Sequence, residues 1–67
     1  MFNIYTWHTI YKKSGKYYYI LYGTYQPIVN MTLSSLTPKL YDSLIKDGYK
    51  KIKIDEKVYL IKNIIEE

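Results

Sequence analysis

The hydrophobic positions of the first 26 residues fall into two runs that predict a long β-hairpin. Residues 2–11 and 17–25 are rich in β-branched and aromatic side chains, and a polar tip at residues 12–16 separates them. The tip contains Ser14-Gly15, and a two-residue turn there places glycine where such a turn needs a positive φ angle. We therefore expect the chain to reverse at this point and the two runs to pair.

Pairing across this turn sorts the side chains onto two faces, because side chains alternate along a strand. One face is mainly aliphatic, and the other is aromatic. The aromatic face holds Tyr5, Trp7, Tyr11, Tyr18 and Tyr22, with Tyr11 opposite Tyr18, Trp7 opposite Tyr22, and Tyr5 opposite Thr24. One face is enough to cover a core, so the aromatic face is the candidate partner-binding surface. The alternative is that residues 28–33, a second hairpin or another copy of the chain covers it.

A short helix is predicted in the middle of the chain. Thr37 suits the N-cap and Pro38 the first helical position, and Gly48 suits the position just past the end. The helix would span residues 38–47, with Leu40, Tyr41, Leu44 and Ile45 in one apolar stripe. We expect this stripe to dock on the aliphatic face of the hairpin. Before it, Pro27 ends a strand and residues 28–33 form either a third strand or an ordered crossing segment.

Residues 49–65 predict a second hairpin. Residues 50–54 alternate with period two, a three-residue turn follows at 55–57, and the pairs are Ile54 with Val58 and Ile52 with Leu60, which form one apolar face. Four side chains would point to the other face: Lys51, Lys53, Tyr59 and Ile61. The expected fold class is α+β: a small antiparallel sheet of two hairpins in the order β-β-(β)-α-β-β, with one short helix packed on one face. We expect a single domain over residues 1–67, and a small curved barrel is the alternative.

The composition limits how such a chain can be stabilised. Sixty-seven residues make a marginal core, and there is no cysteine and only one histidine, His8. Disulfides and thiolate or histidine-rich metal sites are therefore excluded, and we expect neither a metal nor a cofactor. Self-association is the remaining way to stabilise so small a core, so a homo-oligomer is expected. No signal-like start or membrane-length apolar run is present, and the absence of cysteine fits a cytoplasmic protein.

The sequence contains no arrangement typical of a catalytic site. His8 is the one candidate general base near neutral pH, and no serine lies in a hydrolase-type motif. The carboxylates of Asp42, Asp47, Asp55 and Glu56 suit solvated surface positions, and the three glycines are isolated rather than gathered in a phosphate loop. We therefore expect no catalytic residues and no enzymatic activity.

The charge favours anionic partners without indicating base-specific DNA recognition. The net charge is +4, and lysine supplies all ten positive charges. The chain has no arginine, so it lacks the planar guanidinium group that binds the edge of guanine in DNA. A lysine rim around the aromatic face would suit single-stranded nucleic acid, with rings stacking on bases and lysines attracting phosphates. The candidate lysines are Lys12, Lys13, Lys16, Lys50, Lys51 and Lys53. Lysines at edges and turns also protect sheets from aggregation, and an AT-rich genome would enrich lysine.

Two functional hypotheses follow. The first is a small non-catalytic binding protein that attaches to a host protein as an inhibitor or modulator through the aromatic face. A small, tyrosine-rich, catalytically bare chain is similar in type to phage and mobile-element proteins that block host functions, including anti-defence proteins, and this is analogy. The alternative is a single-stranded nucleic-acid-binding protein. A third hypothesis is that a small nucleotide binds at an oligomer interface, although the sequence contains no phosphate-binding motif.

Overall fold

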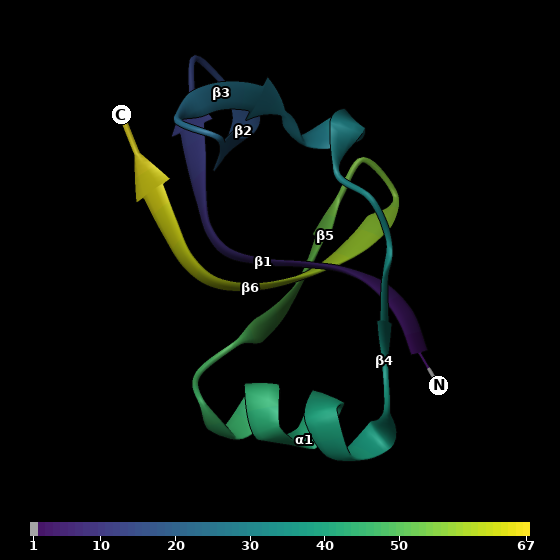
Figure 1. The fold of residues 1–67 in the computed structure, drawn as a ribbon. Coiled ribbons are helices and arrows are strands. Elements are labelled where there is room, and N and C mark those ends of the chain that lie inside the picture. The colour runs from purple at the N-terminus through teal and green to yellow at the C-terminus, as the bar shows by residue number, and fades with distance from the viewer. Residues whose placement is uncertain (1) are drawn as a thin grey trace.

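The computed structural model describes residues 2–67 as a mixed sheet of six strands with one short helix (Figure 1). The elements in chain order are β1 (Phe2–Lys13), β2 (Lys16–Leu21), β3 (Thr24–Pro27), the 3₁₀ turn η1 (Ile28–Asn30), β4 (Ser34–Leu36), α1 (Pro38–Lys46), β5 (Lys50–Ile54) and β6 (Lys57–Glu66). The strand order is β3-β2-β1-β6-β5, and β4 pairs with the start of β1. The expected α+β class is confirmed.

The sheet is mixed, which corrects the expectation of a purely antiparallel sheet. β1 and β6 run parallel, with Tyr5 beside Tyr59 and Tyr11 beside Ile65. The β5–β6 hairpin forms antiparallel pairs within itself and joins the first hairpin through this parallel contact. Hairpin signals in a sequence report only local reversals, so they did not indicate how the two hairpins join.

The first turn forms as predicted, but the second arm of the hairpin is shorter than expected. Ser14 and Gly15 take φ angles of 51° and 76°, and Tyr11 lies opposite Tyr18. β2 then ends at Leu21, because the next two residues form a second turn with φ angles of 53° and 78°. β3 returns along β2. The expected pairs of Trp7 with Tyr22 and of Tyr5 with Thr24 are therefore wrong.

Residues 28–36 connect the first hairpin to the helix and match the prediction only in part. Of the two alternatives for residues 28–33, the third strand is wrong and the ordered crossing segment is confirmed. Ile28–Asn30 form η1, where the Met31 backbone N–H donates to the Ile28 carbonyl oxygen at 3.1 Å. A strand does follow, but it is β4, at Ser34–Leu36, and it pairs antiparallel with the first residues of β1. Residues 28–33 thus cross over the sheet from β3 to β4 (Figure 1).

The helix begins and ends at the predicted signals. Thr37 is the N-cap, and its hydroxyl oxygen accepts from the Leu40 backbone N–H at 3.1 Å. At the other end Gly48 has a φ angle of 108°, and its N–H donates to the Ile45 carbonyl at 3.2 Å. The Tyr49 N–H donates to the Leu44 carbonyl at 3.1 Å, which completes a Schellman motif.

The helix sits at one end of the sheet rather than over the main core (Figure 1). Its Tyr41 ring packs against Phe2 of β1, with centroids 5.2 Å apart, while no residue of α1 is fully buried. The expected docking on the aliphatic hairpin face is wrong, since Ile10 and Tyr19 of that face are covered by other elements. Among the described residues, no helix has the length and apolar character needed to cross a membrane.

The second hairpin has a two-residue turn, so its predicted register is wrong by one residue. Asp55 and Glu56 take φ angles of 49° and 65°, and Ile54 lies opposite Lys57. The pair Asp55-Glu56 lacks the glycine that usually takes the second position of such a turn. The shift places Tyr59 opposite Ile52 and buries it, although the predicted register pointed Tyr59 away from the core.

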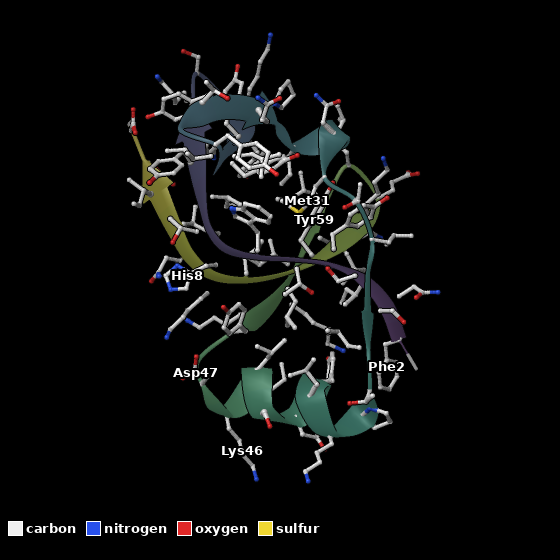
Figure 2. All side chains as sticks on the ribbon, in the orientation of Figure 1. Phe2, His8, Met31, Lys46, Asp47 and Tyr59 are labelled. Atoms are coloured by element: carbon white, nitrogen blue, oxygen red, sulfur yellow. The ribbon has the colours of Figure 1, made fainter. Side chains whose placement is uncertain are left out.

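The core lies inside the bend of β1 and β6. Its buried members come from five elements and the segment that follows η1, and they are Ile10, Tyr19, Ile28, Met31, Ile54, Tyr59 and Ile61. Figure 2 shows Met31 and Tyr59 side by side at the centre of this region. Trp7 and Ile10 would point to opposite faces of a straight strand, yet both contact this cluster, because β1 bends sharply between its two halves (Figure 1).

Candidate functional site: an exposed tyrosine cluster

The five predicted binding residues separate into two groups and one single residue. Tyr5 and Trp7 pack on the core, Tyr11 and Tyr18 lie together on β1 and β2, and Tyr22 stands alone in the turn after β2. The Tyr22 side chain is 95% exposed. The single aromatic face expected from the sequence is therefore divided, because the Tyr22-Gly23 turn shortens one strand and the bend of β1 redirects the other.

Tyr5 and Trp7 contribute to the interior. The Tyr5 ring lies 4.9 Å from that of Tyr59, and the Trp7 ring lies 4.7 Å from that of Tyr19 in an edge-on arrangement. Ile28 and Met31 belong to the same buried cluster, so the segment at residues 28–33 does cover this part of the predicted face. Whether Tyr5 or Trp7 also binds a partner stays a prediction.

The accessible group, here called the tyrosine cluster, consists of Tyr11, Tyr18 and Tyr25. The Tyr25 ring packs edge-on against both others, at centroid distances of 5.6 Å to Tyr11 and 6.3 Å to Tyr18. Edge-on packing is a preferred geometry of aromatic pairs. The three rings therefore hold one another in place on the outside of β1, β2 and β3.

The strand register explains how these three rings meet. Tyr11 and Tyr18 are direct cross-strand partners in the first hairpin, as the sequence predicts. Tyr25 lies opposite Ile20, two positions from Tyr18, and this diagonal separation is within reach of an aromatic side chain. Sequence reasoning missed Tyr25 because it assigned this residue to the far end of a single long arm. The Tyr22-Gly23 dipeptide is the signal that could have found it.

A lysine and a glutamate lie at the edge of the tyrosine cluster. The Lys13 ammonium group lies 4.5 Å from the centre of the Tyr25 ring and 3.7 Å from a carboxylate oxygen of Glu67. The Tyr25 hydroxyl donates to the other Glu67 oxygen at 3.3 Å. A pocket of about 280 Å³ opens beside these groups and is lined by Lys13, Ser14, Tyr18 and Tyr25. The tyrosine cluster is thus apolar at its centre, with one positive and one negative charge at its edge.

The six candidate lysines do not form one rim around this cluster. Lys13 borders the tyrosine cluster. The Lys12 ammonium group lies 5.7 Å from the centre of the Tyr17 ring, and Lys16 lines a different pocket. The other three are exposed on β5, which β1 and β6 separate from β2, and they are Lys50, Lys51 and Lys53. Whether any of them binds an anion stays a prediction.

A groove at the start of β1 gathers aromatic rings and lysines. Its volume is about 560 Å³, and its lining includes Phe2, Tyr5 and Tyr41. The Lys51 ammonium group lies 5.9 Å from the centre of the Tyr41 ring, and that of Lys57 lies 5.8 Å from the centre of the Tyr5 ring. Among the described residues that line the groove, none is acidic. Two cations therefore face aromatic rings without a carboxylate in the groove wall.

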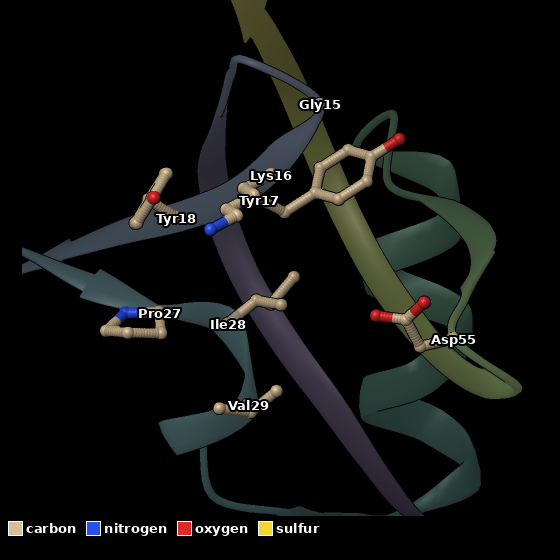
Figure 3. A pocket seen from close by; sticks show the side chains of 8 residues that line it. All are labelled: Gly15, Lys16, Tyr17, Tyr18, Pro27, Ile28, Val29 and Asp55. Carbon is tan, nitrogen blue, oxygen red and sulfur yellow. The ribbon is translucent and has the colours of Figure 1, made fainter.

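A third pocket, of about 330 Å³, lies between the first hairpin tip, η1 and the turn before β6. Figure 3 shows Tyr17 and Asp55 on one side of it and Pro27 on the other. Lys16 and Asp55 bring opposite charges to its wall. The described wall of this pocket therefore carries one charge of each sign.

The one histidine lies apart from all three cavities. His8 is exposed on the outer side of the bend, where its Nδ1 lies 2.6 Å from the Thr9 hydroxyl and its ring faces Tyr49 edge-on at 6.4 Å (Figure 2). Among residues 2–67, no three histidine or carboxylate side chains are grouped so that they could hold a metal ion. The described residues that line the three cavities include aromatic rings, aliphatic side chains and charged groups.

Comparison of this chain with protein-family models, with curated proteins and with solved structures found no match.

Proposed function

We propose that this protein is a small binding protein that attaches to another protein, as an inhibitor or modulator, through the tyrosine cluster. The observation that carries the proposal is the mutual edge-on packing of Tyr11, Tyr18 and Tyr25 on an accessible part of the sheet. Tyrosine buries a large area with few rotatable bonds, so it is enriched among residues that dominate protein interfaces. Rings that already support one another lose little further freedom when a partner binds.

The charges around the cluster favour a protein over a nucleic acid as its partner. The Lys13 ammonium group lies over the Tyr25 ring, and it forms an ion pair with Glu67 at 3.7 Å. A nucleic-acid surface needs a net positive track, because phosphate attraction supplies most of its affinity. An apolar centre with one lysine and one glutamate at its edge instead resembles the polar rim of a protein interface. A host protein is the class of target that the composition suggests.

The experiment compares tyrosine variants that differ only in position. Proteins captured from host lysate by the wild-type protein would be quantified against captures by Tyr25→Ala and Tyr22→Ala. Tyr22 is the matched control, since it is equally a tyrosine near β2 but lies outside the cluster. Capture of the partner should be abolished by Tyr25→Ala and retained by Tyr22→Ala, provided that circular dichroism shows both variants folded.

Binding measurements with the purified partner would then give the change in dissociation constant for each variant. Removing an interface anchor costs about 2 kcal/mol or more, which is roughly a 30-fold weaker dissociation constant, whereas an exposed residue outside the interface costs almost nothing. Equal affinity of the wild-type protein and a folded Tyr25→Ala variant would refute the assignment. A Tyr25→Phe variant that binds normally would show that the ring, rather than its bond to Glu67, makes the contact.

Single-stranded nucleic acid is the second candidate, at the groove rather than at the tyrosine cluster. The observation in its favour is that Lys51 and Lys57 lie over the rings of Tyr41 and Tyr5 in a groove wall whose described residues include no acid. Bases could stack on the rings while the lysines attract phosphates. Of the six lysines named from the sequence, Lys51 is the one in this groove.

Salt dependence tests this candidate. Fluorescence anisotropy of a labelled oligothymidine should give an affinity that falls steeply with salt. Lys51→Gln with Lys57→Gln should reduce the slope by about 0.7 for each phosphate that a lysine no longer neutralises. Lys46→Gln, on the exposed side of α1, is the control and should leave the slope unchanged. Binding that does not depend on salt would exclude this candidate.

A further inference from the structure

One half of β6 has a neighbour on only one side. β5 pairs with β6 over Lys57–Ile61, whereas β1 pairs with it over residues 59–66. Along residues 62–66, on the side away from β1, no strand pairs with β6 among the described residues. Figure 1 shows this part of β6 rising away from β5 with its outer side open. We call residues 62–66 of β6 the open edge.

The backbone of the open edge presents hydrogen-bonding groups outward. The Glu67 N–H donates to the Lys12 carbonyl oxygen at 2.9 Å, so Glu67 points its backbone groups toward β1. Backbone groups of successive residues in a strand point to alternate sides. The N–H and C=O of Glu66 and Ile64 therefore face outward, and those of Ile65 face β1. An outward row of this kind is a template for pairing with another strand.

The sequence of the open edge, Lys-Asn-Ile-Ile-Glu, is complementary to itself in one antiparallel register. With Ile64 on a two-fold axis, Ile64 faces the same residue of the second copy, and Lys62 faces Glu66 of the second copy at each end. The outward-facing residues then form pairs that exchange both backbone hydrogen bonds. Opposite charges directly across two strands attract, so this register is favoured over its neighbours.

The side chains of the open edge also suit burial. Ile64 is 44% exposed and Ile65 is 42% exposed, and as neighbours in a strand they point to opposite faces of the sheet. The other edges of the sheet are protected, since β3 ends in Pro27 and β5 carries Lys50, Lys51 and Lys53. A chain of 67 residues has a marginal core, and association would bury these two isoleucines.

We propose that two copies of this chain pair antiparallel along residues 62–66 of β6, with Ile64 on the two-fold axis, to form one continuous sheet. The two-fold axis is perpendicular to the sheet, so both copies present the same face on the same side. Tyr11 is beside Ile65 in the β1–β6 register, which places each tyrosine cluster next to the new interface. The inference does not depend on the function proposed above.

Charge reversal with complementation tests the register. Lys62→Glu alone places a glutamate opposite Glu66 at both ends of the interface, and Glu66→Lys alone places a lysine opposite Lys62 at both ends. Each variant should be monomeric in sedimentation equilibrium where the wild-type protein is a dimer, with a dissociation constant roughly 10- to 100-fold weaker. An equimolar mixture of the two variants should recover the dimer, because residues 62 and 66 again carry opposite charges at both ends of the interface.

Matched controls separate this register from general charge effects. Lys62 also bonds to Asp47, at 3.2 Å, so Asp47→Asn removes that ion pair without changing the open edge and should stay dimeric. Lys46→Glu and Glu56→Lys repeat the two charge changes at exposed sites elsewhere and should stay dimeric as well. If the mixture remains monomeric while the wild-type protein is a dimer, the proposed register is wrong.

A backbone test distinguishes the two sides of β6. Ile64→Pro removes an outward N–H and should leave the fold intact while abolishing the dimer. Ile65→Pro removes an N–H that faces β1 and should destabilise the fold itself. A wild-type protein that is monomeric at millimolar concentration, or an Ile64→Pro variant that remains a dimer, would overturn the proposal.

Discussion

Replacing Tyr22 by asparagine should make the protein more stable. Tyr22 has a φ angle of 53° in the two-residue turn between β2 and β3, and Gly23 follows at 78°. Two positive φ angles in a two-residue hairpin turn are the pattern for which Asn-Gly is the preferred sequence. A tyrosine in this left-handed region is strained, because its Cβ approaches the backbone carbonyl oxygen.

The expected gain follows from the strain and from the exposure of the ring. The left-handed conformation costs an ordinary residue roughly 1–2 kcal/mol, and asparagine avoids part of this cost by local hydrogen bonding. The Tyr22 side chain is 95% exposed, so removing the ring sacrifices almost no packing. A net gain of about 0.5–1 kcal/mol is expected, which corresponds to a rise in Tm of about 2–8 °C for a domain of this size.

Thermal unfolding followed by circular dichroism measures the change, with Tyr22→Ala as the control. Alanine also removes the ring but does not favour a positive φ angle, so the difference in Tm between the two variants isolates the backbone preference. If Tyr22→Asn is no more stable than Tyr22→Ala, the turn does not have the described conformation. If both variants lose stability by the same amount, the Tyr22 ring makes a contact that its exposure does not account for.

Three further substitutions test the interior. Trp7→Ala should cost about 3–5 kcal/mol, comparable with the whole stability of so small a domain, and near-ultraviolet circular dichroism would show loss of the fold. Thr6→Val should raise the free energy of unfolding by about 1 kcal/mol in urea titration, because the buried Thr6 hydroxyl has no hydrogen-bond partner among the described residues. Burial raises the pKa of Tyr59 above its ordinary value of 10.0, and its electrostatic interactions with Tyr5 and Asp55 act in the same direction. The neutral phenol is thus favoured in the folded state, so stability should fall as the pH rises above 10.0, and Tyr59→Phe should move the alkaline unfolding midpoint to higher pH.

Local signals in the sequence were enough to predict the helix and the first turn. Thr37, Pro38 and Gly48 each satisfy a requirement of the helix backbone next to them, so no distant contact was needed to place α1. Ser14-Gly15 likewise supplied its own turn geometry and, with it, the Tyr11–Tyr18 pair. This pair of the tyrosine cluster could therefore be identified before the fold was known.

The rest depended on residues that adopt conformations they do not normally favour. Tyr22, Asp55 and Glu56 all have positive φ angles, yet neither Tyr22-Gly23 nor Asp55-Glu56 is one of the preferred turn dipeptides, Asn-Gly and Asp-Gly. Missing the first of these turns assigned Trp7 to an exposed face and left Tyr25 out of the cluster. Missing the second placed Tyr59 outside the core. The parallel pairing of β1 with β6 left no local pattern in either strand.

That parallel pairing determines how the protein folds. Each hairpin can form in microseconds, since its partners are close in sequence. The sheet is complete only when β6 reaches β1, and Tyr5 and Tyr59 lie near opposite ends of the chain. Closing a loop of about 50 residues costs roughly 3–4 kcal/mol of chain entropy, and this cost arises before the contacts between β1 and β6 can offset it. Among the described residues, three of the four most deeply buried side chains become fully buried only at that step, namely Tyr59, Leu60 and Ile61. Folding should therefore be one cooperative event on the millisecond-to-second scale, in which neither hairpin persists without the other.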